Sequence, residues 1–216
     1  MKYWFAVEGN IGSGKSEFME MLHNVFNDKV SCRKEPQYKW KCTQHSKECS
    51  SNLLDLFYSD TKRWAYTFQT RCVVSRIMDY KRTTKQITFC ERSWVSDKYV
   101  QAKTLVDLNL MSTFEYELFE EFYDWTTKSA SQISGYIYLK KSPETCFENV
   151  KNEVGIQLTY IKHLHNAYED MFLNKTFQDI PILIINMDKS YTKEEYKTML
   201  ITSFPILNNY IVKECL

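Results

Sequence analysis

The chain has 216 residues and a formal net charge of +1, and 44% of its residues are hydrophobic. This size fits one domain with a sizeable core, and the balanced charge excludes the basic footprint expected of a nucleic-acid-binding or membrane-surface protein. Seven scattered cysteines, a start that leads directly into an apolar run and no run long enough to cross a bilayer predict a cytoplasmic protein with reduced thiols.

Short apolar runs alternate with longer segments of helical period, which predicts an α/β fold with a parallel sheet. The expected strands are Lys2–Val7, Lys29–Lys34, Gln86–Cys90, Gly135–Leu139 and Ile182–Asn186. The expected helices are Lys15–Asn27, Thr61–Arg82, Trp94–Asn109, Thr113–Lys128, Pro143–Asn152, Leu158–Asn174 and Lys193–Met199. No repeat or linker divides the sequence, so residues 1–216 are expected to form a single domain.

The first expected strand leads into the phosphate-binding pattern G-x-x-x-x-G-K-[ST], which an amphipathic helical pattern follows. Glycines let consecutive backbone N–H groups surround phosphates, and the start of the helix adds the positive end of its dipole. Lys15 is expected to reach the β- and γ-phosphates of ATP, and the Ser16 hydroxyl to ligate Mg²⁺. These features predict a P-loop NTPase fold. The expected ATP-binding residues of the loop are Gly9, Asn10, Ile11, Gly12, Ser13, Gly14, Lys15 and Ser16.

Charged residues follow the second and third expected strands. Ligands of parallel α/β sheets bind at the carboxyl edge of the strands, where these side chains would lie. Glu35 is placed to accept a proton from a substrate hydroxyl. Glu91 is suited to Mg²⁺, and Arg92 to the charge of a transferring phosphoryl group. Taken without the P-loop, each of these residues is better explained as an ordinary surface charge.

The sequence resembles the deoxynucleoside kinases, in the branch that holds deoxycytidine, deoxyguanosine and deoxyadenosine kinases. The similarity extends from about residue 2 to residue 196. It rests on Glu8–Ser16, Glu35-Pro36, Trp40, Tyr58, Arg63-Trp64, Thr67–Thr70, Ser75-Arg76, Glu91–Ser93, Ser96-Asp97, Pro143–Cys146, Leu164-His165 and Pro181–Leu183.

The resemblance implies a catalytic role for several charged residues. Glu35 is implied to be the general base that takes the proton of the sugar 5′-hydroxyl. Arg92 is implied to orient that hydroxyl and to stabilise developing charge. Lys15 and Glu91 complete the implied catalytic set, and Ser16 and Glu91 are the implied Mg²⁺ ligands.

The resemblance also implies a nucleoside pocket. Gln69 is implied to pair with the base, Phe68 to stack on it and Trp40 to line the pocket. Tyr58 and Glu153 are implied to hold the sugar 3′-hydroxyl. The implied substrate-binding residues are Glu35, Trp40, Tyr58, Phe68, Gln69, Arg76, Arg92, Asp97 and Glu153.

Two features address the choice of base. In the family, a pair like Arg76 and Asp97 accompanies bases with an exocyclic amino or keto group. A carboxylate accepts from an amino group but would face an acceptor or a methyl group in thymine. We therefore expect dA, dC or dG to be favoured over dT. Cys72 and Gln101 add room and polarity, which mildly favours purines, with deoxyadenosine as first choice.

The phosphate-donor side departs from the family pattern. The lid, at about residues 147–155, is shorter and lacks the arginines that family members place over the phosphates. Lys151 is expected to substitute in part, which predicts a raised KM for ATP because a point charge lacks the fork of arginine. The resemblance implies that Lys189, Ser190 and Tyr191 occupy the position at which family members contact the adenine of ATP.

The function implied is transfer of the γ-phosphate of ATP to the 5′-hydroxyl of a deoxynucleoside in nucleotide salvage. A homodimer is implied, formed through Thr61–Arg82 and Thr113–Lys128. Two alternatives remain open. One is a non-catalytic structural subunit, which would not need the retained Lys15, Ser16 or Glu35. The other is a nucleoside monophosphate kinase, which would need more basic residues than the short lid offers.

Overall fold

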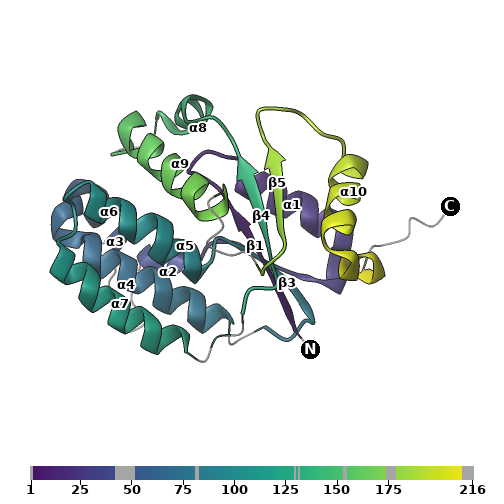
Figure 1. Cartoon of the computed structure of the whole chain (residues 1–216), viewed down its shortest axis with the longest axis horizontal. Coiled ribbons are helices and arrows are strands. Elements are labelled where there is room, and N and C mark those ends of the chain that lie inside the picture. Colours follow the sequence, from purple (N-terminus) through teal and green to yellow (C-terminus); the bar gives the residue numbers. More distant parts are fainter. Residues whose placement is uncertain are drawn as a thin grey trace.

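The computed structural model describes residues 2–41, 52–80, 83–128, 130, 132–152, 155–173 and 179–210. Within these residues, five parallel strands form one sheet in the order β2-β3-β1-β4-β5, with helices on both faces (Figure 1). The strands are β1 (Tyr3–Glu8), β2 (Ser31–Arg33), β3 (Ile87–Glu91), β4 (Gly135–Lys140) and β5 (Ile182–Asn186). The predicted α/β fold is confirmed.

The described helices agree with most of the expected ones. They are α1 (Lys15–Phe26), α2 (Tyr38–Lys41), α3 (Leu53–Ser59), α4 (Thr61–Tyr80), α5 (Trp94–Ser96), the π-helical segment η2 (Asp97–Ala102), α6 (Lys103–Asp107), α7 (Thr113–Thr127), α8 (Pro143–Val150), α9 (Leu158–Leu173) and α10 (Lys193–Ser203). Short 3₁₀ helices cover Asn27–Lys29 and Pro205–Tyr210. The expected helix Trp94–Asn109 is therefore one continuous helical run with a π-helical middle, a feature frequent near functional sites.

Three expectations about the elements are corrected. The strand expected at Lys29–Lys34 is shorter, because the 3₁₀ turn Asn27–Lys29 follows α1 directly. The helices α2 and α3 were not expected, since four and seven residues are too few to show a helical period. Helix α3 begins at an N-cap, where the Asn52 side chain accepts a hydrogen bond from the backbone of Leu54 at 3.0 Å.

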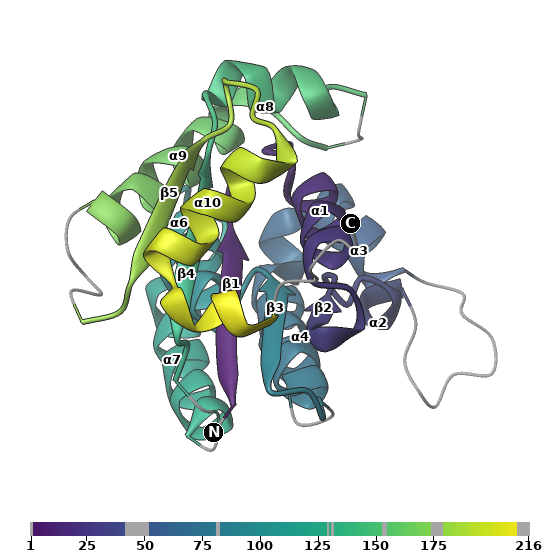
Figure 2. The ribbon, with the colours of Figure 1, turned by 90° about the vertical axis from the view of Figure 1, so that its right-hand side faces the viewer.

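The two faces of the sheet build two separate apolar layers. Phe5 and Val7 of β1 pack toward α1 and α10, whereas Trp4 and Ala6 belong to the layer with α4, α7 and α9. This alternation follows from the two-residue period of a strand. Figure 2 shows α10 in front of the sheet, on the face that α1 also covers.

Parallel pairing brings the functional segments to one edge. Val7 of β1 pairs in register with Glu91 of β3, so the loop that begins at Gly9 starts beside Glu91. The backbone N–H of Arg92 continues this pairing by donating to the Val7 carbonyl at 2.9 Å. The P-loop and the charged end of β3 are thus neighbours because of strand order.

Gly135 offers a test of packing between β4 and the C-terminal segment. A Cβ atom at Gly135 would lie 2.5 Å from a ring carbon of Phe204 and 3.0 Å from one of Phe5, both of which are buried. We expect Gly135→Ala to lower the free energy of unfolding by about 1–3 kcal/mol, as overpacked cores do. Urea denaturation measures this loss. Phe204→Leu in the same background should cost less than it does alone, and strictly additive losses would contradict the steric explanation.

Candidate active site

The P-loop encloses a buried lysine. The Lys15 ammonium donates to the Asn10 carbonyl at 2.6 Å, and the Asn10 side chain donates to the Ile161 carbonyl at 2.8 Å. Burial, with the charge of Arg92, lowers the pKa of Lys15 to about 7. Gly12 has a φ of 76° and touches α8, because a Cβ there would overlap the carbonyl oxygen of Cys146. The loop is therefore held between β1 and α8, with its lysine facing inward.

Two adjoining cavities meet at this loop. The first, which we name the P-loop cavity, measures about 670 Å³. The second, the aromatic cavity, measures about 310 Å³. Both are lined by Gly12, Lys15, Ser16, Glu91 and Val150, so these residues form the boundary between them. The aromatic cavity gathers eight of the nine predicted substrate residues, namely Glu35, Trp40, Tyr58, Phe68, Gln69, Arg76, Arg92 and Asp97.

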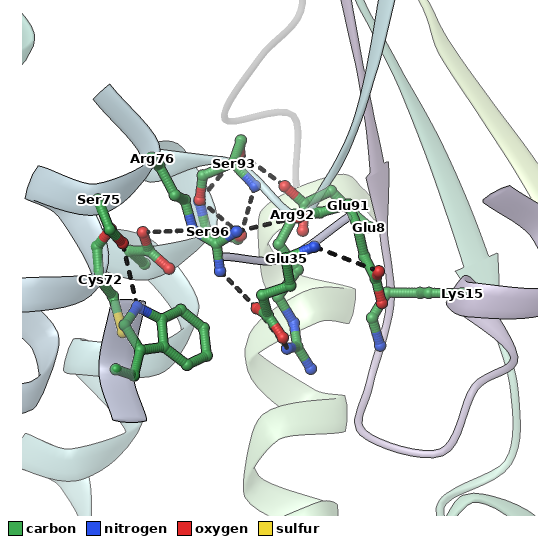
Figure 3. Close-up of polar contacts among 12 residues, drawn as sticks. Glu8, Lys15, Glu35, Cys72, Ser75, Arg76, Glu91, Arg92, Ser93 and Ser96 are labelled. Carbon is green, nitrogen blue, oxygen red and sulfur yellow. Dashed lines mark hydrogen bonds and ion pairs between the residues drawn. The ribbon is translucent and has the colours of Figure 1, made fainter. Parts of the chain in front are cut away.

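Glu35 lies between two arginines at the end of the aromatic cavity (Figure 3). Its carboxylate is 2.5 Å from Arg76 Nη2 and 2.9 Å from Arg92 Nη1, and its side chain is only 8% exposed. Burial alone would raise the pKa of Glu35, but the charges of Arg92 and Arg76 outweigh it and lower the pKa to about 2. The group is therefore ionised at neutral pH and able to accept a hydrogen bond from a hydroxyl.

Ser16 and Glu91 place two oxygen ligands at the boundary of the cavities. The Ser16 hydroxyl donates to Glu91 Oε1 at 3.2 Å, and Glu91 Oε2 accepts from the backbone N–H of Glu35 at 3.4 Å. A hydroxyl and a carboxylate are donor types that Mg²⁺ prefers in phosphate sites. The pair predicted to bind the metal therefore fits Mg²⁺ in chemistry and in position.

Aromatic rings form one wall of the second cavity. Phe57 and Phe68 stack with ring centroids 4.5 Å apart, and Trp40 meets Phe68 edge-on at 5.4 Å. Trp40 is fixed by a hydrogen bond from its indole nitrogen to the Ser75 hydroxyl at 3.0 Å. Such a flat, apolar wall suits the face of an aromatic base.

The same cavity is also lined by buried polar side-chain atoms. Gln69 Oε1 and Gln101 Nε2 are buried, and neither has a hydrogen-bond partner within the described part of the chain. An unpaired buried polar atom costs about 1–3 kcal/mol. Asp97 accepts a hydrogen bond from Arg76 Nε at 2.8 Å, and Cys72 lines the same cavity. A ligand whose edge carries both hydrogen-bond donors and acceptors would pair with these polar atoms.

Several residues predicted to bind ATP lie outside both cavities. Lys151 pairs with Glu148 at 2.6 Å and lines neither cavity. Lys189, Ser190 and Tyr191 are also absent from the lining, where Met187 and Tyr196 stand instead. Glu153, predicted to hold the sugar, lies outside the described residues.

The sequence did not predict some lining residues. They are Gln37, Leu54, Phe57 and Tyr160 in the aromatic cavity, Glu17, Phe18, Met21, Lys141, Asn149, Met187 and Tyr196 in the P-loop cavity, and Val150 in both. Phe57 lies on the short α3, which had no detectable period. Lys141 directly follows an expected strand, which was a usable signal for this edge of the sheet.

A second buried carboxylate supports Arg92 from behind. Glu8, at the end of β1, accepts a hydrogen bond from the Ser93 hydroxyl at 2.6 Å (Figure 3). It also accepts one from the Tyr168 hydroxyl at 3.4 Å. Tyr168 also interacts electrostatically with Arg92, whose backbone has the unusual φ of 58°. Burial raises the pKa of Glu8 to about 7, against the hydrogen bond from Ser93. Glu8 therefore connects the start of the P-loop to the turn that carries Arg92.

The family model described as deoxynucleoside kinase matches residues 5–206. The chain belongs to the deoxynucleoside kinase family. Among its relatives it is 34% identical to the mitochondrial deoxyguanosine kinase of Xenopus laevis, over 86% of this chain and 82% of that protein. It is 30% identical to human deoxycytidine kinase, over 90% and 86% of the two chains. A probable deoxycytidine kinase of fowlpox virus is 31% identical, over 92% of this chain and 84% of its own length. The family predicted from the sequence is confirmed.

None of the helices in the described ranges combines the length and the apolar character that crossing a bilayer requires.

The raised pKa of Glu8 makes stability depend on pH. An unfolded glutamate ionises near its ordinary value of 4.5, whereas Glu8 in the fold ionises near 7. Unfolding between these values releases a proton, so the stability contributed by Glu8 falls as the pH rises. The unfolding free energy of Glu8→Gln minus that of the parent should therefore rise by at least about 1 kcal/mol from pH 5 to pH 8. Urea denaturation of both proteins at each pH measures this difference.

Glu169→Gln is the matched control. Burial raises the pKa of Glu169, but hydrogen bonds from Lys140 and Tyr138 outweigh this and keep it below its ordinary value. Glu169 is therefore largely ionised in both states from pH 5 to pH 8, and the stability curve of its variant should run nearly parallel to that of the parent. If the Glu8→Gln curve is parallel as well, the pKa of Glu8 is not raised.

Proposed function

We propose that this chain transfers the γ-phosphate of ATP to the 5′-hydroxyl of a deoxynucleoside. The observation that carries the proposal is the position of Glu35, which lies in the aromatic cavity close to the boundary with the P-loop cavity. A nucleoside stacked on Phe68 would direct its sugar toward that boundary. A triphosphate on the P-loop would approach the same boundary from the other side.

Each charged residue at the boundary has a proposed task. Glu35 accepts a hydrogen bond from the sugar hydroxyl and takes its proton as the phosphoryl group arrives. In a loose transition state the proton moves late, so a carboxylate of low basicity suffices when it is well placed. Arg92 orients Glu35, to which it is bonded at 2.9 Å, and with Lys15 stabilises the charge on the phosphoryl oxygens.

Mg²⁺ is the proposed metal, with Ser16 and Glu91 as the residues that would hold it. When bound, the ion neutralises charge on the phosphates of ATP. The rest of the proposed mechanism depends on the side chains of this chain.

The proposed substrates are dA, dC and dG rather than dT. The relatives are named for deoxyguanosine and deoxycytidine, which supports this class. Arg76 donates hydrogen bonds from Nε to Asp97, from Nη1 to the Glu91 carbonyl and from Nη2 to Glu35. Its pair with Asp97 is therefore fixed in place. The deoxyadenosine preference expected from Cys72 and Gln101 finds no support in these names, so the proposal covers the class and not one base.

Three further expectations stay predictions. A homodimer is supported by exposed apolar side chains on α7, where Phe114 is 67% and Trp125 is 77% exposed. A role in nucleotide salvage follows from the proposed reaction. Cytoplasmic localisation rests on the sequence alone, and one relative is named as mitochondrial.

Removing the charge of Glu35 tests the proposed base. Glu35→Gln is expected to lower kcat by about 10²- to 10⁴-fold, because the amide cannot take the proton. Steady-state kinetics with dA, dC, dG and dT measure the loss, and a thermal unfolding scan verifies that the variant is folded. Glu20→Gln changes an exposed glutamate that pairs with Lys34 and should leave kcat unaltered. Near-normal kcat in a folded Glu35→Gln variant would overturn the assignment.

Gln101 tests whether the unpaired amide contacts the base. Gln101→Leu keeps the approximate size but removes a hydrogen bond worth about 0.5–1.5 kcal/mol, so KM for the favoured deoxynucleoside should rise about 3- to 10-fold. KM for ATP should not change. The exposed Gln86 supplies the control variant Gln86→Leu. Equal effects on both substrates would indicate altered folding rather than lost base contact.

A further inference from the structure

The P-loop cavity contains a cation that the sequence motif does not include. Its charged lining residues are two glutamates, Glu17 and Glu91, and two lysines, Lys15 and Lys141. A triphosphate remains negative after one Mg²⁺ has bound, so a single lysine among two carboxylates would leave it poorly compensated. Lys141, the second lysine of the lining, would therefore compensate part of the remaining negative charge.

The backbone around Lys141 is held on both sides. Lys141 directly follows β4, at the sheet edge where the P-loop begins. The preceding side chain, Lys140, pairs with Glu169. The following residue, Ser142, is bonded through its N–H to Asp188 at 3.0 Å and through its hydroxyl to Thr145 at 2.7 Å.

Lys141 itself forms no ion pair with any carboxylate in the described ranges of the chain. Its ammonium is thus available to a ligand, while its neighbours fix the turn from which it extends. An ordered backbone reduces the entropy that binding must overcome.

The charges of Lys141 and Lys15 both act on the same buried side chain, Cys146. Burial raises the pKa of the Cys146 thiol to about 11, and the charges of Lys15 and Lys141 both oppose that rise. Cys146 lies against Gly12 of the P-loop, and the Asn149 side chain of the same helix donates to the Gly12 carbonyl at 2.8 Å. The fields of the two lysines therefore overlap where α8 meets the phosphate loop.

We propose that Lys141 binds the phosphates of the donor nucleotide as the second cation beside Lys15. In this proposal Lys141 takes the place of Lys151, which the sequence suggested for this task. Lys151 is 52% exposed, is paired with Glu148 and lines neither cavity. The proposal rests on the proposed function, since it assigns a residue of the same site to the triphosphate.

The test compares Lys141→Met with Lys151→Met in the full chain. Methionine keeps most of the side-chain length and removes the charge. Binding of a non-hydrolysable ATP analogue with Mg²⁺ is measured by calorimetry at low and at moderate salt, and KM for ATP is measured in parallel. Lys141→Met should weaken analogue binding about 5- to 30-fold, the range expected for a lost charge-assisted contact that is partly screened. Lys141→Arg should retain binding within about 3-fold.

Lys151→Met is the matched control and should bind the analogue like the parent. The salt dependence of binding should also be shallower for Lys141→Met than for the parent, because one ionic contact is missing. Unchanged binding by Lys141→Met, or an equal loss in Lys151→Met, would overturn the assignment of Lys141.

The same experiment separates this proposal from the proposed function. A parent protein that binds the analogue but phosphorylates no deoxynucleoside would refute the kinase reaction, whereas the binding arms would still decide the role of Lys141. A parent that binds no ATP analogue would refute both.

Discussion

A buried carboxylate between two guanidinium groups holds the site together. Glu35 follows β2, Arg76 belongs to α4 and Arg92 follows β3, so three separate parts of the chain meet in one charge cluster. Taking such charges out of water costs several kcal/mol for each ion, and the cost is recovered only when the partners stay in contact. Separating any of these elements would leave an uncompensated charge. The cluster therefore fixes the width of the aromatic cavity.

The same cluster links recognition to chemistry. Arg76 contacts Asp97 at one end and Glu35 at the other, which joins the part of the cavity proposed to hold the base to the part proposed to hold the reacting hydroxyl. Behind Arg92, Tyr168 and Glu8 form a second buried layer. Because a partly satisfied buried network is costly, these layers favour one arrangement over looser ones.

The phosphate side is built in a different way. Gly12 lies directly against α8, and the side chain of Asn149 closes the contact by bonding to the loop. Helix α8 thus forms part of the P-loop cavity, and Lys141, in the turn after β4, is the lysine proposed to add positive charge there. A cation on a fixed turn has less freedom to lose on binding than one on an exposed helix end.

The sequence by itself determined the fold class and the catalytic edge. Alternating apolar and helical segments indicate parallel strands, and parallel strands direct every carboxyl end to one edge. That rule was enough to predict that Glu35, Glu91 and Arg92 lie near the P-loop. It worked because each of these residues lies within two residues of the end of a strand, where position along the chain decides position in space.

Only the tertiary structure decided which lysines line the P-loop cavity and which side chains close the aromatic cavity. Lys141 and Lys151 look alike in sequence, but one extends from a strand end into the cavity and the other pairs with a glutamate on its own side of a helix. Phe57 and Tyr160 come from helices whose contribution to the cavity depends on how α3 and α9 pack against α4 and the loop. The direction of a side chain on a helix or turn is set by contacts between distant parts of the chain, and local sequence does not contain that information.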